Sequence, residues 1–279
     1  MPQIKKRYWF LLVLIIGFLA LFFVGRNSRL LFAAVDKQDL PEIERLLKKG
    51  VNPNIIRDRD KWYDVYDHLS RCETPLHCAN TYNNLPMLKK LLAYKADPNI
   101  YTNNNCTPLW AGLDDMDFTR ALIEAGADPN VKCKFHIADL RPIGMFVKSF
   151  EQFEYLIAHG LDVHAVDNDS ATFIHRFAAW PIAVKLLIKM GLDANAKPIG
   201  KSYQTPLCEA VRKSAVESVE LLLENGASPL VECGKGRLPT AYISYARKFY
   251  YDDKEEMARI DAIEKLLEDA MEKESAGKK

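Results

Sequence analysis

The stretch TPLHCANTYNNLPMLKKLLAYKADPN, from Thr74 to Asn99, decides the fold of this chain. It opens on Thr-Pro-Leu-His, carries a Leu-Leu pair near its middle and closes on Ala-Asp-Pro-Asn. A stretch of the same length and pattern, TPLCEAVRKSAVESVELLLENGASPL, returns at Thr205–Leu230. Recurrence at a fixed internal spacing is the signature of a repeat array, in which each unit needs a neighbour to cover its apolar face.

The residue types in this unit favour a pair of helices. Thr74 is placed to cap a helix start, and the proline after it suits the first helical position. The second half has apolar residues at helical spacing, namely Leu85, Leu88, Leu91 and Leu92. A glycine such as Gly126 follows the second helix in most units and favours the left-handed conformation that ends a helix, whereas Lys95 stands there in this one.

The closing position of the unit recurs six times, at intervals of 31 to 45 residues: Asn54, Asn99, Asn130, His164, Asn195 and Leu230. This pattern resembles the ankyrin repeat, whose TPLHxA motif stands here as Thr74-Pro75-Leu76-His77-Cys78-Ala79. The resemblance implies an all-α fold, an ankyrin-repeat solenoid of helix-turn-helix repeats joined by hairpin loops. We expect about six repeats and C-terminal capping helices over residues 26–272, and a polar tail at 273–279.

Two repeats depart from the pattern. The third keeps Thr107-Pro108-Leu109 but has Trp110 at the histidine position, and its first helix is two residues shorter. The fourth is the most degenerate, because little of the motif survives around residues 139–142. We therefore expect the first helix of the fourth repeat to be the least regular.

Residues 8–25, YWFLLVLIIGFLALFFVG, carry no charge and lie between Lys5-Lys6-Arg7 and Arg26. At about 1.5 Å per residue this run is just long enough for a transmembrane helix. No pair of small residues suited to cleavage follows it, so the sequence favours an uncleaved signal anchor over a removed signal peptide. The fold class therefore includes an N-terminal transmembrane helix ahead of the repeats.

Basic residues near the two ends of this run set its expected orientation. Residues 1–7 hold three of them and the amino terminus, against Arg26 and Arg29 on the other side. This balance predicts a single-pass protein of the bacterial inner membrane, with a short cytoplasmic N-terminus and a periplasmic repeat domain. The alternative is a reversed anchor, which would make the chain a cytoplasm-facing membrane scaffold.

An insertion at residues 55–73 separates the first two repeats and carries Trp62, Tyr63 and Tyr66. Insertions in a solenoid gather on one face, which is often the binding face, although these aromatic residues would equally suit packing on the first repeat. Further aromatic residues stand at positions expected at loop tips or on the concave face. With the three in the insertion they form the predicted partner-binding set, whose other members are Tyr101, Trp110, Phe135, Trp180 and Tyr203.

The sequence indicates no chemistry beyond binding. It lacks a P-loop, a GxSxG, an HExxH and a dinucleotide glycine motif, so we expect no enzyme, no cofactor and no small-molecule ligand. His68, Cys72, His77 and Cys78 cluster in sequence, but their spacing matches no standard zinc site, so no metal is predicted. The net charge of +1 leaves no basic excess for nucleic acid.

Whether the six cysteines form disulfides depends on the compartment in which the repeats lie. An exported domain meets oxidising conditions, and six cysteines allow fifteen pairings. Cys106 and Cys133 fall in successive inter-repeat hairpins, so we expect a disulfide between them. Cys208 and Cys233 belong to the sixth repeat and the hairpin after it. Cys78 lies at a motif position that is usually apolar, and we expect it to be simply buried.

The resemblance to membrane-anchored, periplasm-facing bacterial ankyrin-repeat proteins implies a non-enzymatic protein–protein interaction module. Its partner would be a secreted envelope-targeting toxin, with this chain as the immunity protein, or a periplasmic redox enzyme such as catalase. The short link between residues 8–25 and the repeats favours the first, because it confines the repeats to the bilayer surface. A structural role in an envelope assembly is a third hypothesis.

Overall fold

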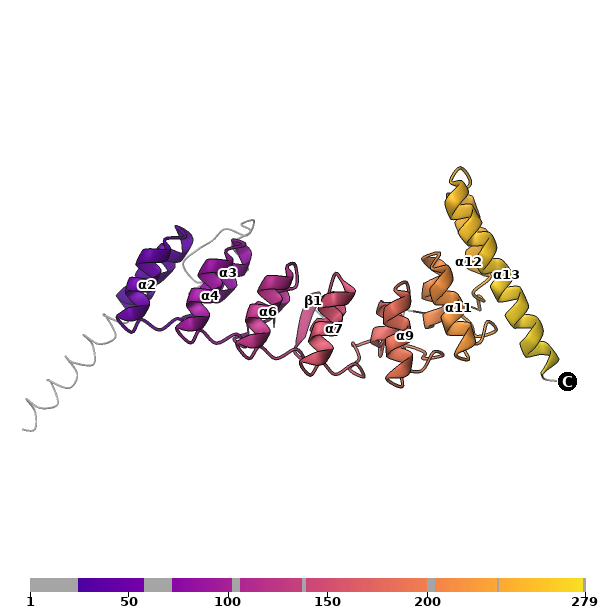
Figure 1. Ribbon diagram of the computed structural model, residues 1–279, viewed down its shortest axis with the longest axis horizontal. Coiled ribbons are helices and arrows are strands. Elements are labelled where there is room, and N and C mark those ends of the chain that lie inside the picture. The colour runs from indigo at the N-terminus through magenta and orange to yellow at the C-terminus, as the bar shows by residue number, and fades with distance from the viewer. Residues whose placement is uncertain are drawn as a thin grey trace, which may run out of the picture. The chain divides into compact units, whose positions relative to one another are not determined.

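The computed structural model describes residues 25–57, 72–101, 106–136, 139–199, 204–234 and 236–277 (Figure 1). The contacts within the chain group it into two compact units, Met1–Asp128 and Pro129–Lys279, which we call unit 1 and unit 2. Both are built from successive helix pairs, as the repeated sequence predicts.

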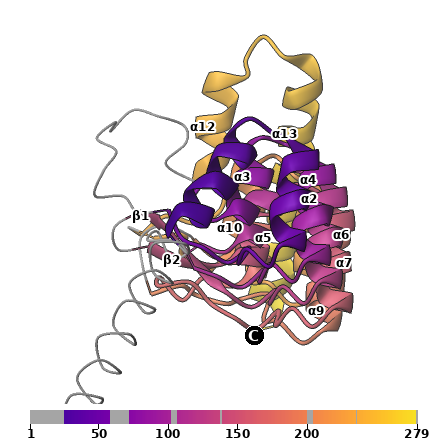
Figure 2. The same cartoon turned by 90° about the vertical axis from the view of Figure 1, so that its left-hand side faces the viewer.

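The described residues of unit 1 form three helix pairs. Residues 25–36 form a helix that pairs with the first of the following helices: α2 (Leu40–Lys48), α3 (Pro75–Thr81), α4 (Leu85–Ala93), α5 (Pro108–Gly112) and α6 (Met116–Glu124). The first helices α3 and α5 lie side by side in one layer, and the second helices α4 and α6 lie in another (Figure 2). Helix α5 is two residues shorter than α3, which confirms the expected shortening in the third repeat.

Unit 2 begins with two strands and then returns to helix pairs. Its elements are β1 (Lys132–His136), β2 (Asp139–Pro142), the 3₁₀ helix η3 (Ile143–Phe146), α7 (Phe150–Ala158), α8 (Phe173–Arg176), α9 (Pro181–Lys189), α10 (Pro206–Arg212), α11 (Val216–Glu224), α12 (Ala241–Phe249) and α13 (Lys254–Ala276).

The hairpin of β1 and β2 is the largest departure from a purely helical chain. The strands are antiparallel, with Cys133 opposite Arg141 and an irregular register between Lys134 and His136. They precede η3, a single short turn that stands in place of the first helix of the fourth repeat. The fourth repeat lacks the threonine cap and most of the motif, so nothing in its sequence starts a full α-helix there.

The motif residues cap the helices as the sequence predicts. The Thr74 hydroxyl accepts from the backbone N–H of His77 at 3.4 Å, and Thr205 accepts from that of Cys208 at 3.3 Å. Gly126 ends its repeat at φ +91°, and Lys95 adopts φ +64° at the corresponding place. A side chain rarely takes that left-handed conformation, so Lys95 makes the end of α4 less favourable than a glycine would.

An asparagine ladder joins the hairpins within each unit. Asn99 shows the geometry: its Nδ2 donates to the Gly126 carbonyl at 2.9 Å, and its Oδ1 accepts from the N–H of Asp128 at 2.8 Å. Asn54, Asn130 and Asn195 make the same pair of bonds to the next repeat. Across the part of the chain that the structure covers, His164 makes no such pair, so the ladder is interrupted after the fourth repeat.

The core is formed by the motif leucines and by an aromatic group in unit 2. Leu76, Leu109 and Leu207, the leucines of the three TPL triplets, are at most 1% exposed. Phe153 and Phe173 are fully buried and stack with their ring centroids 5.5 Å apart. The motif leucine thus holds each first helix against its neighbours, and burial of such side chains supplies most of the stability.

Helix α13 closes unit 2 by covering α11 and α12. Ile260, Ile263 and Leu267 lie on its buried stripe, as the sequence predicts for a capping helix. The helix runs to Ala276, so most of the stretch expected as a polar tail is helical. Glu274 explains part of this difference, because its carboxylate accepts a hydrogen bond from the Ser228 hydroxyl at 2.7 Å.

Several expectations lie outside the described residues. These include the predicted membrane anchor at residues 8–25, of which only Gly25 is described, and the orientation assigned to it. Among residues 25–57, 72–101, 106–136, 139–199, 204–234 and 236–277, no helix is long and apolar enough to cross a membrane. The insertion is described only at its two ends, residues 55–57 and 72–73.

Candidate partner-binding site

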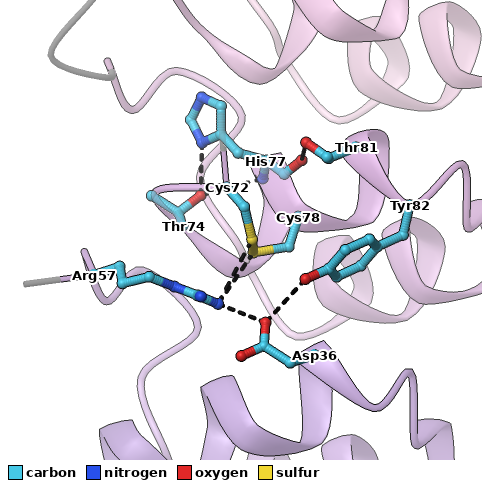
Figure 3. Close-up of a disulfide and its surroundings, with 8 residues drawn as sticks. All are labelled: Asp36, Arg57, Cys72, Thr74, His77, Cys78, Thr81 and Tyr82. Carbon is cyan, nitrogen blue, oxygen red and sulfur yellow. Dashed lines mark hydrogen bonds and ion pairs between the residues drawn. A yellow bond between two sulfur atoms is a disulfide. The ribbon is translucent and has the colours of Figure 1, made fainter. Parts of the chain in front are cut away.

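A disulfide and an ion pair meet beside the first helices of repeats 1 and 2 (Figure 3). Cys72 and Cys78 are bridged at the start of α3, and both are buried. The Nη2 atom of Arg57 lies 3.6 Å from the sulfur of Cys72 and 3.9 Å from that of Cys78. The same nitrogen donates to Oδ1 of Asp36 at 2.6 Å. With Tyr82, we call these residues the Arg57 cluster.

Arg57 is held by three kinds of contact. Besides the ion pair and the sulfurs, its guanidinium carbon lies 4.5 Å from the centroid of the Phe32 ring, a cation–π arrangement. The Tyr82 hydroxyl donates to Oδ1 of Asp36 at 3.0 Å (Figure 3). The side chains of Arg57 and Asp36 remain 24% and 41% exposed. The cluster therefore presents a fixed charge pair and a phenol that another protein can reach.

The cluster also fixes both ends of the insertion. The backbone N–H of Arg57, at its beginning, donates to the carbonyl of Glu73 at 2.7 Å, and Cys72, near its end, is tied to α3. The insertion thus leaves and rejoins the fold at one place on the first-helix side of unit 1. Trp62, Tyr63 and Tyr66 lie between these ends and outside the described residues, so their binding role stays a prediction.

The motif histidine of repeat 2 lies beside the cluster and is 3% exposed. Its Nδ1 is 2.8 Å from Oγ1 of Thr74. Burial lowers the pKa of His77 to about 4, and the backbone of Cys106 in the next hairpin opposes this shift without reversing it. His77 is therefore neutral at pH 7. Its ring nitrogen contacts the helix cap, and the following hairpin lies close enough to affect its charge, which indicates a structural role.

Repeats 5 and 6 link the first helix to the following hairpin through the same motif position. Nδ1 of His175 accepts from the Thr172 N–H at 3.1 Å, which leaves Nε2 to donate to the Ala196 carbonyl at 3.0 Å. In repeat 6 the histidine position is Cys208, which is bridged to Cys233 of the next hairpin. A covalent bond thus stands where repeats 2 and 5 have a histidine.

A group of cations lies at the end of the first helices in unit 2. The Glu209 side chain is 5% exposed and accepts from Nη2 of Arg212 at 2.6 Å. Burial lowers the pKa of Lys213, Glu209 raises it, and the positive charges of Arg176 and Arg212 lower it further. Arg176, Arg212 and Lys213, which we call the basic group, lie close enough for Arg176 and Arg212 to affect the charge of Lys213, and Glu209 is paired with Arg212. Such a group suits an acidic partner surface.

The cysteine predictions need correction. Cys106 and Cys133 are not bridged to each other; both are thiols, and each is buried within its own unit. Cys78 is not simply buried, because it pairs with Cys72. The predicted bridge was wrong because positions in successive hairpins need not bring two sulfur atoms together. Cys72 and Cys78, six residues apart at the end of the insertion, were the available signal.

The remaining aromatic predictions are placed as follows. Tyr101 is 50% exposed, and Trp110 on α5 is half-buried. Trp180, at the start of α9, stacks on Phe177 with centroids 4.7 Å apart, so packing accounts for part of its surface. Phe135 belongs to β1, and Tyr203 is outside the described residues. The Arg57 cluster is made of other residues, and the sequence did not single out its Asp36 and Arg57.

One group in the described part of the chain has the residue types of a metal site. It consists of Asp36, Cys72 and Cys78, whose ligand atoms lie within 4.8 Å of one another. The two sulfurs are joined in the disulfide and cannot act as thiolates, and Arg57 neutralises the carboxylate. The arrangement is suited to hydrogen bonding and charge recognition at a protein surface.

Comparison with known proteins identifies the repeat. The family model described as "Ankyrin repeats (3 copies)" matches residues 30–133 and 145–233. The B-cell lymphoma 3 protein homolog of Mus musculus is 26% identical over 167 residues, which cover 56% of this chain and 37% of that protein. An ankyrin repeat protein of Fowlpox virus (strain NVSL) is 29% identical over 164 residues, 58% of this chain and 22% of that protein. The chain thus spans well under half the length of these relatives.

Two solved structures share the fold. The ankyrin repeat domain of human ASB11 aligns with a TM-score of 0.53 and 22% identity, over 75% of this chain and 89% of that one. A complex of a predatory endopeptidase from Bdellovibrio bacteriovorus with an immunity protein aligns with a TM-score of 0.56 and 22% identity. That alignment covers 71% of this chain and 98% of the other.

Proposed function

Since this chain belongs to the ankyrin repeat family, we propose that it acts by binding another protein, without catalysis, from an anchored position on the periplasmic side of a bacterial inner membrane. Ankyrin repeats are protein-binding modules, and the first helices and hairpins offer an extended surface. The finer parts of this proposal are the anchor at residues 8–25, the compartment and the kind of partner.

The Arg57 cluster is the observation that carries the binding role. A charge pair, a phenol and a disulfide are fixed together on the first-helix side of unit 1, and their polar edge is exposed. Side chains that are already ordered lose little conformational entropy when a partner docks. Arginine and tyrosine are also the residue types that contribute most at protein interfaces.

Three features support the location and the partner. The run 8–25 has the length and apolarity of a membrane anchor, and only a few residues separate it from the first repeat. Disulfides such as Cys72–Cys78 and Cys208–Cys233 persist in oxidising compartments, which favours export. The similar fold in an endopeptidase–immunity protein complex supports our proposal that the partner is a secreted toxin that attacks the envelope.

Partner capture tests the binding face. Full-length protein would be cross-linked in its host envelope, and the captured proteins would be identified by mass spectrometry. Arg57→Glu, and separately the pair Arg212→Glu and Lys213→Glu, should lower capture of a specific partner at least tenfold, because both reverse charges on the first-helix side. Lys185→Glu, at an exposed position on the second helix α9, is the matched control and should change nothing. Equal capture by all variants would contradict the proposal.

Topology and protection test the remaining parts. A reporter active only outside the cytoplasm, fused after Lys279, should be active, and a cytoplasm-only reporter should be silent. Cells that express the chain should survive an envelope-attacking toxin delivered by a competitor, and Arg57→Glu should reduce survival. An active cytoplasmic reporter would overturn the periplasmic location. Survival that is independent of the chain would overturn the immunity role and leave the redox-enzyme partner to be tested.

A further inference from the structure

A cationic cleft opens at the N-terminal end of the first repeat. It has a volume of about 260 Å³ and lies between the helix of residues 25–36 and the second half of α2. Its cations are Arg26, Arg45 and Lys49, and its apolar lining is Leu30, Leu46 and Val51. No preceding repeat covers this end within the described residues, and Leu30 is 40% exposed.

The positive charge of the cleft is only partly compensated. Arg45 is paired with Glu42, its Nη2 lying 2.5 Å from Oε1. In the described part of the chain, Arg26 and Lys49 are in no ion pair, and no carboxylate lines the cleft. Lys49 acts on Glu42 through space and helps to lower the pKa of that carboxyl. Two cations are thus left for an anion from outside the chain.

The place of the cleft in the chain identifies the kind of anion. Arg26 follows directly on the uncharged run 8–25, and the fold brings Arg45 and Lys49, from the far end of α2, to the same cleft. If the run spans the bilayer, Arg26 lies at the level of the lipid headgroups. This step rests on the proposed membrane attachment, but not on which side of the membrane the repeats occupy.

We propose that this cleft binds the headgroup of an anionic phospholipid. Arg26 and Lys49 contact the phosphate, and Leu30 lies against the glycerol and the upper acyl chain. A free phosphate would use the cations but not the apolar lining. Basic side chains near an anionic membrane each strengthen binding about fivefold. The lipid would therefore seat the first repeat against the bilayer, in addition to the anchor itself.

The test uses full-length protein purified in a neutral detergent. Native mass spectrometry would count the lipids retained when phosphatidylglycerol or phosphatidylcholine with the same acyl chains is added. We expect one phosphatidylglycerol to be retained at least fivefold better than phosphatidylcholine. The double variant Arg26→Gln with Lys49→Gln should lose this preference, and Arg26→Lys with Lys49→Arg should keep it. Lys89→Gln, an exposed lysine of α4 in the same unit, is the matched control and should behave as wild type.

Three results would overturn the proposal. They are equal retention of the two lipids, an unchanged preference in the Gln double variant, and loss of the preference in Lys89→Gln. Inorganic phosphate that displaces the lipid at equal concentration would reassign the cleft to a free anion. Extraction with alkaline carbonate separates this proposal from the membrane attachment itself. Release of the full chain would contradict the anchor, whereas a chain that stays in the membrane without lipid preference contradicts only the cleft.

Discussion

Repeat 2 of unit 1 and repeat 6 of unit 2 have different chemistry at the position where the first helix lies beside the next hairpin. At the same motif position, repeat 2 has the buried, neutral His77, and repeat 6 has Cys208 bonded to Cys233. The backbone geometry tolerates both, because both side chains are buried on the same face of the first helix. We therefore expect repeat 2 to respond to protons and repeat 6 to respond to reductants.

The two disulfides differ in the same way. Cys208–Cys233 closes a segment of 25 residues and joins a first helix to the hairpin beyond it. Cys72–Cys78 closes only 6 residues and fixes the end of the insertion beside Arg57. The former therefore supports the fold of repeat 6, and the latter shapes the candidate binding surface.

Removing the longer bridge should have the largest effect. In the double variant Cys208→Ser with Cys233→Ser, the free energy of unfolding of repeat 6 should fall by about 3.5 kcal/mol, from the entropy of a 25-residue loop. Hydrogen exchange of the amides of α10 and α11 would measure it. Reductant should bring wild type to the level of the variant and leave the variant unchanged. Equal protection in the two proteins would contradict the expectation.

Removing the shorter bridge should cost less. Cys72→Ser with Cys78→Ser removes the bridge that closes a 6-residue loop, so the expected loss is about 2 kcal/mol, confined to repeats 1 and 2. Hydrogen exchange of α3 and α4 would report it, with α10 as the internal control. A larger loss than for Cys208–Cys233 would show that the contacts of Arg57 depend on the bridge.

Acid should weaken repeat 2 more than repeat 6. Because the pKa of His77 falls from about 6.5 unfolded to about 4 folded, the unfolded state binds more protons between these values. The stabilising effect of the neutral ring is therefore complete above pH 6.5 and is lost as the pH falls to 4. Between pH 7 and 5 the loss is about 2 kcal/mol. His77→Gln, which cannot titrate, should remove this dependence from α3; parallel curves for variant and wild type would contradict it.

Changes in the asparagine ladder should have the smallest effect on the free energy of unfolding. His164→Asn should restore the missing hydrogen bonds to the fifth repeat and raise the free energy of unfolding of unit 2 by about 1 kcal/mol. The reverse change at an existing rung, Asn195→His, should lower it by a similar amount. Chemical denaturation, with the unfolding of α9 as the signal, would measure both changes in the free energy of unfolding. If His164→Asn left stability unchanged, the hairpin after repeat 4 would be unable to reach its neighbour.

Much of the fold followed from the sequence, because it depends on interactions between residues close in the chain. The Thr-Pro-Leu triplets, the helical spacing of leucines and the glycines after second helices predicted the helix pairs and their capping. The same local logic predicted the short α5 and the irregular fourth repeat. It did not predict the β1–β2 hairpin, because loss of a helix signal does not specify what replaces the helix.

The site depended on tertiary structure, because its members are brought together from separate segments. Sequence alone determined the repeat class, the apolar run at 8–25 and the number of cysteines. Only the folded chain decided that Cys72 pairs with Cys78, that Arg57 reaches Asp36, and that Arg45 and Lys49 join Arg26 in one cleft. A pairing of this kind depends on distances across the stack of helices, which the local pattern of one repeat does not contain.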